Sequence, residues 1–321
     1  MASLPCPWLA RLALAGAFAA ALPAAAFDLQ GHRGARGLAP ENTLAAFRKA
    51  LSVGVTTLET DVGITRDGIA VIAHDRHLNP AIARGADGKW IPDPGPVLRT
   101  LDFAQLREFD VGRLDPASSY AKQFPQQEPA DGERIPALDD VLALARAHPR
   151  PVRLNLETKL SPLAPGDTVD PATFVRTVVG AVKRAGLLDR TTLQSFDWRT
   201  LLEAKALEPR MGTVCLTLEG GANDNVKPDA SGRSPWLAGI GPDSVPRMAK
   251  QARCDVWSPF WRNVTRERIA EAKGLGLAVI PWTVNEPADM QAMIDLGVDG
   301  LITDYPDRAR AVLAGRGLPL P

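Results

Sequence analysis

An excess of charge of either sign is what this sequence most clearly lacks. Its 37 lysines and arginines balance 37 aspartates and glutamates, and the sequence pI is about 6.9. Proteins that hold nucleic acid non-specifically carry a basic field, which this composition does not supply. We therefore expect a small-molecule partner and no nucleic-acid partner.

Long hydrophobic runs are lacking as well. The candidate near the start, residues 12–22, has 11 apolar residues, whereas a membrane-spanning helix needs about 20. Arg11 precedes this run and three small residues, 24–26, follow it, which is the arrangement of a secretory signal peptide. We expect cleavage after Ala26 and export to the periplasm or the medium. The mature chain, residues 27–321, is expected to form one domain without a membrane span.

Cysteine is scarce, with only three residues in the chain. Cys6 lies in the predicted leader, and Cys215 and Cys254 lack the paired C-x-x-C spacing of zinc sites. Both of these cysteines fall in strand-like runs, so a bridge is conceivable in an oxidising compartment. The sequence favours two buried free thiols over a disulfide.

What the chain does have is a regular alternation of short apolar runs and amphipathic stretches. Eight strand-then-helix pairs follow one another from Phe27 to the end. Eight is the number of a (β/α)₈ barrel, in which a parallel sheet closes inside a ring of helices. An open doubly wound sheet is the alternative, but its glycine-rich dinucleotide signature is missing. The predicted fold class is therefore an α/β TIM barrel.

Two segments interrupt this alternation. Residues 62–75, from the second strand onward, carry an Asp-Gly turn between two β-like arms, which predicts a hairpin. A long excursion over about residues 76–134 follows it. Residues 218–245, after the sixth strand, are rich in Gly, Pro, Asn, Asp and Ser and predict a loop. Both interruptions follow the carboxyl ends of strands, where barrel enzymes carry their sites.

Acidic side chains gather on two strands. Alternate residues of a strand face the same side, which places Glu59 and Asp61 of the second strand and Glu157 and Lys159 of the third toward the barrel axis. Three converging carboxylates repel one another unless a cation neutralises them. Because all the ligands are oxygens, we expect one divalent cation, Ca²⁺ or Mg²⁺. The alternative is a salt-bridge cluster that uses Lys159 and Arg33.

Two of the four histidines should meet at the same rim. His32 ends the first strand, and His74 ends the returning arm of the hairpin, which brings it back over Asp61. A histidine pair beside a cation and an arginine suits general acid–base catalysis on a phosphate ester. His77 and His148 offer less, because the first lies in the excursion and the second closes a helix.

Three further side chains belong to the predicted site or its edge. Arg33 offers a guanidinium fork for phosphate oxygens. Trp282 faces inward from the seventh strand, where it can wall the pocket or pack in the core. Asp304 is expected to bond amides of its own loop and to take no part in the reaction.

Together these stretches resemble the glycerophosphodiester phosphodiesterase family. The matching segments are GHRGARGLAPENTLAAF, LETDVGITRDGIAVIAHD, NLETK, WTVNEP and GVDGLITDYPD, and they extend over about residues 28–310. The resemblance implies a barrel that hydrolyses glycerophosphodiesters to glycerol 3-phosphate and an alcohol. The glycines of the first segment are then expected to let the backbone approach the substrate.

The resemblance also implies a role for each matching side chain. It implies metal ligands at Glu59, Asp61 and Glu157, an acid–base pair at His32 and His74, phosphate contacts from Arg33 and Lys159, and a polar partner at Asn42. Trp282 joins them as a pocket wall on the strand pattern alone. The loop after the sixth strand matches no family pattern, so the sequence does not predict the alcohol.

Three other functions share some of these features. A related phosphodiesterase for lysophospholipids or sphingomyelin would use the same two histidines, with Trp90 and Trp236 along an apolar approach. A non-catalytic secreted barrel that binds phosphate compounds would not need both histidines and all three carboxylates, yet all five are present. An enolising barrel shares only the number of strands. The sequence does not decide the choice of cation, the roles of the two histidines or the oligomeric state.

Overall fold

The computed structural model describes residues 27–320. The predicted leader and its cleavage point lie outside these residues. None of the helices within the described part combines the length and the apolarity that a bilayer-spanning segment needs.

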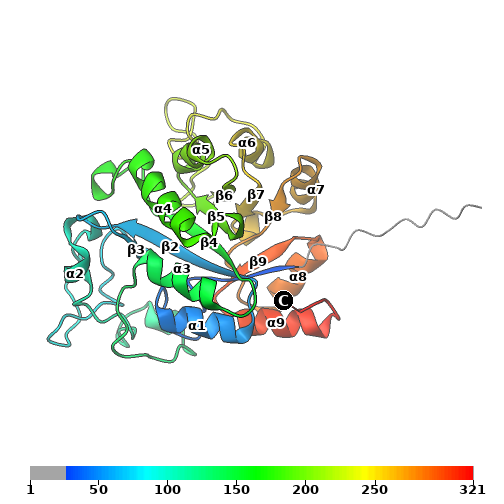
Figure 1. Ribbon diagram of the computed structural model, residues 1–321. Helices are drawn as coiled ribbons and strands as arrows, with labels where there is room; N and C mark the ends of the chain where they lie inside the picture. Colours follow the sequence, from blue (N-terminus) through cyan, green and yellow to red (C-terminus); the bar gives the residue numbers. More distant parts are fainter. Residues whose placement is uncertain (1–26, 321) are drawn as a thin grey trace, which may run out of the picture.

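Within residues 27–320, eight parallel strands form a barrel (Figure 1). They are β1 (Asp28–Gly31), β2 (Thr57–Ile64), β4 (Arg153–Thr158), β5 (Thr191–Ser195), β6 (Gly212–Thr217), β7 (Val256–Pro259), β8 (Ala278–Val279) and β9 (Gly300–Thr303). They pair in the order β8-β7-β6-β5-β4-β2-β1-β9. The amide of Asp299 donates to the carbonyl of Val279 at 2.9 Å, and that of Ile302 to Pro281 at 3.0 Å. These bonds nearly close the barrel, which confirms the predicted fold class.

Helices alternate with the strands and surround them (Figure 1). They are α1 (Leu44–Val53), α2 (Phe103–Leu106), α3 (Leu138–Ala147), α4 (Pro171–Ala185), α5 (Trp198–Leu207), α6 (Val245–Gln251), α7 (Arg266–Gly274), α8 (Pro287–Leu296) and α9 (Pro306–Gly315). Short 3₁₀ turns lie at Leu98–Thr100, Ala121–Gln123, Pro165–Asp167, Leu188–Arg190 and Trp261–Asn263.

Local sequence explains where α4, one of the longest of these helices, begins and ends. The Asp170 side chain accepts a bond from the amide of Thr173, and Pro171 occupies the first helical position, where its missing N–H costs nothing. Gly186 ends the helix in the left-handed conformation at φ 70°, which glycine adopts without penalty. The buried face, which includes Phe174 and Val178, packs against the sheet.

The pleat of β2 and β4 separates the core from the barrel axis. Leu58, Val62, Leu154 and Leu156 belong to the hydrophobic core between the strands and the helices. Residues of the opposite parity face the axis, as the alternation predicts. In the register of the two strands, Asp61 lies opposite Glu157. The acidic side chains therefore gather where the core ends.

The predicted hairpin and excursion are both present. β3 (Ala70–Ile72) pairs antiparallel with β2, and Gly68 in the turn has a φ of +80°. The excursion that follows has a small hydrophobic cluster of its own, formed with parts of β3 and its flanks by Val71, Leu78, Ala83, Leu98, Leu106, Val111 and Ile135. The loop predicted after β6 is confirmed too, since residues 218–244 contain neither helix nor strand.

The expectation of two free thiols is wrong. Cys215 of β6 and Cys254, just before β7, form a disulfide with their Cα atoms 6.0 Å apart. The two strands are neighbours in the sheet, and the connection from α6 brings Cys254 against the helix-facing side of β6. The strand pattern locates each cysteine on its own strand, but it does not specify how the α6–β7 connection crosses β6.

Candidate active site

Glu59, Asp61 and Glu157 meet at the carboxyl end of β2 and β4, as predicted. One carboxylate oxygen from each lies within 4.8 Å of the others. Their exposed fractions are 1%, 0% and 7%. Such a group is costly to bury without positive charge beside it.

Burial and mutual repulsion act on these carboxyl groups. Burial, with the negative charge of Asp61, raises the pKa of Glu59 well above its usual range. Burial also raises the pKa of Glu157, although Lys159 opposes the shift. For Asp61 burial opposes ionisation, but the charges of His74, Arg33 and Lys159 outweigh it and lower the pKa. Without a cation, the group therefore keeps Asp61 ionised and tends to protonate Glu59.

The donor set fits a hard divalent cation. Oδ1 of Asp61 is buried and has no hydrogen-bond partner among the described residues, and Nζ of Lys159 lies 3.6 Å from it. An oxygen that is orphaned in this way, beside two other carboxylates, is suited to ligate Ca²⁺ or Mg²⁺. The triad can therefore hold a metal ion.

Both cations of the predicted salt-bridge alternative are also present. Nζ of Lys159 lies 2.7 Å from Oε1 of Glu157, and Nε of Arg33 lies 3.2 Å from Oδ2 of Asp61. Two positive groups thus face three carboxylates, so the salt bridges alone do not neutralise the group when all three are ionised. The salt bridges and a metal ion are compatible.

The loop after β1 is shaped to support the triad. The amide of Arg33 donates to Glu59 at 2.8 Å, and its guanidinium bonds Glu41 at 2.7 Å. Nδ2 of Asn42 donates to Asp61 at 2.9 Å, while its oxygen accepts from Thr60. Arg33 and Asn42 have φ values of 50° and 57°, an uncommon conformation for such residues. The side chains of Arg33 and Asn42 therefore contact the protein's own carboxylates in this structure.

The glycines of this loop allow close packing within the protein. A Cβ at Gly31 would lie 2.1 Å from the carbonyl oxygen of Gly34, and one at Gly34 would lie 2.6 Å from the backbone of Ala46. At Gly37 it would meet the ring of Tyr305 at 2.3 Å. Each glycine thus makes room for the protein's own atoms. These contacts are enough to explain the three glycines, and the expected approach of their backbone to the substrate stays a prediction.

The imidazole of His32 is held by the carboxylate of Asp304. Its Nδ1 lies 2.6 Å from Oδ1 of Asp304, and its Nε2 lies 3.9 Å from Glu59. Burial, and next the charge of Arg36, lowers the pKa of His32 to about 4 although Asp304 opposes the shift. The ring is therefore neutral at pH 7. With an ionised Asp304 at Nδ1, the proton sits on Nδ1 and Nε2 is free to accept.

The expectation that Asp304 bonds backbone amides of its own loop is wrong, because only side chains of the described residues donate to its carboxylate. Its two carboxylate oxygens accept from His32, from both Nε and Nη2 of Arg36 at 2.9 and 3.0 Å, and from Asn285 at 2.7 Å. Burial opposes ionisation, but Arg36 and His32 lower the pKa of Asp304. The carboxylate is a stable anchor for the imidazole.

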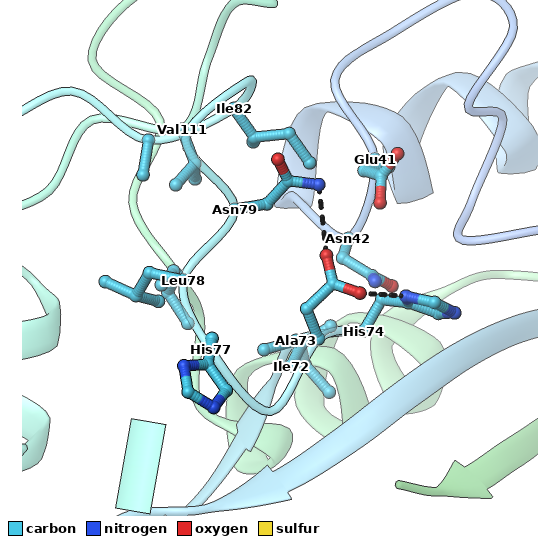
Figure 2. Close-up of a pocket in the computed structure, with 13 residues that line it drawn as sticks. Glu41, Asn42, Ile72, Ala73, His74, His77, Leu78, Asn79, Ile82 and Val111 are labelled. Atoms are coloured by element: carbon cyan, nitrogen blue, oxygen red, sulfur yellow. Dashed lines mark hydrogen bonds and ion pairs between the residues drawn. The ribbon is translucent and has the colours of Figure 1, made fainter. Parts of the chain in front are cut away.

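His74 lies at the end of the hairpin, where the amide of Ala73 donates to the carbonyl of Asp61 at 3.0 Å. Nδ1 of His74 lies 2.7 Å from Oδ1 of Asp75, whose other oxygen accepts from Asn79 at 3.0 Å (Figure 2). A small cavity of about 50 Å³ lies between this group and the side chains of Ile82 and Val111. The two histidines are therefore each fixed through Nδ1.

Several side chains that support the site were missed by sequence reasoning. The hydroxyl of Tyr120 donates to Glu41 and accepts from Nη1 of Arg36 at 3.1 Å. Nε2 of Gln194 donates to Glu59 at 2.5 Å. Glu41 lies in the PENT segment, which is a usable signal. Tyr120 comes from the excursion, and nothing in its surrounding sequence points to the site.

A larger cavity of about 720 Å³ opens beside His74, Glu157 and Lys159. Trp282 lines it, as predicted, and so does Trp236 of the loop after β6. His77 also lines it, with Nδ1 3.1 Å from the carbonyl of Gly95.

Two other residues considered from the sequence lie elsewhere. Trp90 packs against Arg84 in the excursion, with the guanidinium carbon 5.5 Å from its ring centre. His148 follows the last residue of α3, and its Nδ1 lies 2.9 Å from the carbonyl of Arg150.

Known proteins resemble this chain over most of its length. A profile of the Glycerophosphoryl diester phosphodiesterase family matches residues 32–308. The glycerophosphodiester phosphodiesterase of Caldanaerobacter subterraneus subsp. tengcongensis is 28% identical over 276 residues, which cover 86% of this chain and 93% of that protein. That of Bacillus subtilis is 26% identical over 300 residues and covers 88% and 85%.

Solved structures share the fold. A crystal structure assigned as a glycerophosphoryl diester phosphodiesterase from Silicibacter pomeroyi DSS-3 has a TM-score of 0.83 and 35% identity, covering 94% of this chain and 97% of that one. A phosphodiesterase of Oleispira antarctica, in complex with the product sn-glycerol-3-phosphate, has a TM-score of 0.67 and 22% identity, covering 89% and 96%. The chain belongs to the glycerophosphoryl diester phosphodiesterase family, and its enzymatic class is that of a glycerophosphodiester phosphodiesterase.

Proposed function

We propose that this enzyme hydrolyses glycerophosphodiesters to glycerol 3-phosphate and an alcohol, with a divalent cation, Ca²⁺ or Mg²⁺, on Glu59, Asp61 and Glu157. One observation carries the proposal. Two histidines, each fixed at Nδ1 by an aspartate, flank a buried triad of carboxylates that has an oxygen without a hydrogen bond. The product is proposed because the Oleispira antarctica phosphodiesterase binds sn-glycerol-3-phosphate.

When bound, the cation would neutralise charge on the phosphate and lower the pKa of the attacking hydroxyl. The chain's own groups supply the rest. Lys159 and Arg33 lie at the triad and add positive charge for the phosphate oxygens. One of the two histidines, His32 and His74, takes the proton of the attacking hydroxyl, which belongs to water or to the glycerol of the substrate. The other protonates the departing alcohol. If the glycerol hydroxyl attacks, this step forms a cyclic glycerol phosphate, and water then opens the ring to give glycerol 3-phosphate.

The first experiment measures glycerol 3-phosphate released from glycerophosphocholine by the purified mature chain. The enzyme is assayed after chelation and again with Ca²⁺ or Mg²⁺ restored. Release that depends on the ion supports the reaction and the metal together. Activity that survives complete chelation would argue against the metal.

Histidine variants test the acid–base pair. His32→Ala and His74→Ala should each lower kcat by roughly 10²–10⁴-fold. His148→Ala is the matched control, because this histidine bonds only the backbone at the end of α3. Full activity in both site variants would contradict the assignment.

Trapping a cyclic glycerol phosphate would identify the glycerol hydroxyl as the attacking group, and prompt ¹⁸O incorporation without it would identify water.

We also infer export of the chain and a single mature domain over residues 27–321. The leader-like composition of residues 1–26 and the Cys215–Cys254 disulfide support this, because disulfides persist in oxidising compartments. Mass spectrometry of protein from the cell exterior tests it. The expected mature N-terminus is Phe27, and an intact Met1 on cytosolic protein would contradict export.

A further inference from the structure

The cavity of about 720 Å³ has two ends of different chemistry. His74, Glu157 and Lys159 line one end and belong to the site described above. Away from them, beside polar residues such as His77, Asn79 and Ser161, the cavity has an apolar wall that comes from four loops after barrel strands. Its members are Leu160, Leu163, Phe196, Leu218, Trp236 and Trp282.

Two of these aromatic side chains, Trp282 and Phe196, offer only ring surface to the cavity. Nε1 of Trp282 donates to the carbonyl of Ser258 at 3.0 Å, which satisfies the single polar atom of the side chain. Phe196 packs edge to face against the same indole, with ring centres 5.3 Å apart. A substrate that meets these rings therefore finds no hydrogen-bond donor there.

The loop after β6 is held in place before any substrate binds. Asn225, 2% exposed, donates to the carbonyls of Phe196 and Leu216 and accepts from the amide of Leu218. The hydroxyl of Ser234, also buried, donates to the carbonyl of Asn225 at 2.5 Å. Because these two polar residues fix the loop on the barrel, the position of Trp236 beyond them is preformed.

The carboxylates of this lining are poorly placed to recognise a positively charged alcohol. Asp224 accepts from the amides of Gly220, Val226 and Lys227. Asp75 is engaged by His74 and Asn79. Asp93 is exposed to water at the rim, where an ion pair is weak. None of these three carboxylates is therefore both buried and free of hydrogen bonds, as a dedicated partner for an ammonium group would be.

We propose that this apolar wall binds an alkyl or acyl portion of the alcohol that the enzyme releases, so that the preferred substrates are glycerophosphodiesters of apolar alcohols. The inference rests on the proposed function for the position of the scissile phosphate beside His74 and Lys159. It adds the chemistry of the group on the other side of that phosphate, which neither the family nor the site residues specify.

A series of glycerophosphodiesters tests the wall. The alcohols are ethanol, butanol and hexanol, whose esters are too short to form micelles at assay concentrations. For wild type, kcat/KM should rise by up to about fourfold for each methylene that becomes buried. Leu163, 71% exposed, can be changed without risk to the core. Leu163→Ser should reduce the hexanol-to-ethanol ratio of kcat/KM at least threefold. Leu207→Ser, at an exposed leucine on α5, should leave the ratio unchanged.

A second pair of substrates separates an apolar wall from an ammonium site. Glycerophosphocholine is compared with its uncharged isostere, the 3,3-dimethylbutyl ester. Equal or better turnover of the neutral ester supports the proposal. A preference of tenfold or more for choline would overturn it in favour of a cation–π site on the same rings.

Binding measurements keep this inference distinct from the proposed function. Calorimetry with non-hydrolysable phosphonate analogues of the same series measures binding affinity at the apolar wall without turnover. If all esters bind alike, or if kcat/KM is flat across a series that is hydrolysed, the apolar subsite is refuted and the proposed function stands. If nothing is hydrolysed but affinity still rises with chain length and Leu163→Ser abolishes the rise, the wall stands and the proposed reaction fails.

Discussion

Nδ1 of His32 lies 2.6 Å from Oδ1 of Asp304, although 272 residues separate the two in the chain. Arg36 and Asn285 bond the same carboxylate. The aspartate therefore fixes the direction of the imidazole and the nitrogen that carries its proton. A residue that follows β9, the last barrel strand, thus positions the side chain of a residue that follows β1, the first strand.

Asp304→Asn should lower kcat by roughly 10²–10⁴-fold while leaving the fold intact, because an amide can offer Nδ1 a hydrogen and so favour the wrong tautomer. The requirement for the cation should not change, since Asp304 is not one of the acidic triad. Asp307→Asn, an exposed aspartate in the first turn of α9, is the control. Steady-state kinetics measure kcat and the cation requirement, and thermal unfolding tests whether the fold is intact. Wild-type kcat in Asp304→Asn would show that His32 needs no such partner.

Tyr120→Phe should loosen the excursion from the site. The variant loses the bonds to Glu41 and Arg36, and hydrogen bonds to charged groups contribute about 1.5–3 kcal/mol. We expect the free energy of unfolding to fall by about that amount and kcat to fall more than KM changes. Tyr305→Phe removes the other tyrosine hydroxyl of the chain, which bonds none of the described residues. If both variants lose the same stability, the Tyr120 contacts are not special.

The pH dependence of metal binding follows from Glu59. Its pKa is raised in the metal-free fold by burial and by Asp61, so its contribution to stability is present below the unfolded pKa and is lost as pH rises through the folded one. A cation should reverse that loss and release a proton as it binds. Calorimetry in two buffers of different ionisation enthalpy should detect the proton, and apparent affinity should weaken as pH falls. Glu59→Gln should reduce the proton release; an unchanged release would assign the proton to another group, such as Glu157, whose pKa is also raised.

Removing the disulfide should destabilise the fold and spare the site. Cys215 and Cys254 are 39 residues apart, and closing a loop of that length contributes about 2–4 kcal/mol. The double variant Cys215→Ala/Cys254→Ala should therefore unfold at a lower urea concentration with unchanged kcat at 25 °C. An unchanged urea midpoint would mean that packing alone holds these strands.

The parts of the site that could be predicted are those governed by local periodicity. Alternation along β2 and β4 is enough to place Glu59, Asp61 and Glu157 on one side, and the Asp-Gly turn is enough to return His74 over Asp61. Each inference needs only a few residues on either side. The barrel follows in the same way from the repeated strand–helix unit.

The rest of the site depends on how segments that are distant in the sequence pack against one another. Asp304 could not be assigned to His32 without the closure of the barrel, and Tyr120 approaches Glu41 only because the excursion folds back over the first loop. The glycines show a related limit. Their number was visible, but whether they make room for a substrate or for Ala46 and Tyr305 depends on packing. Hydrophobic patterns do not indicate which distant side chains contact each other in the folded chain.

The anchoring of the loop after β6 has a practical consequence for protein engineering. Residues 227–233 are exposed, and they lie between the buried anchors Asn225 and Ser234. Exposed segments with fixed ends tolerate insertions well. None of residues 227–233 lines the cavity of about 720 Å³, so a fluorescent reporter or an affinity tag inserted at this tip should leave the wall of the cavity undisturbed.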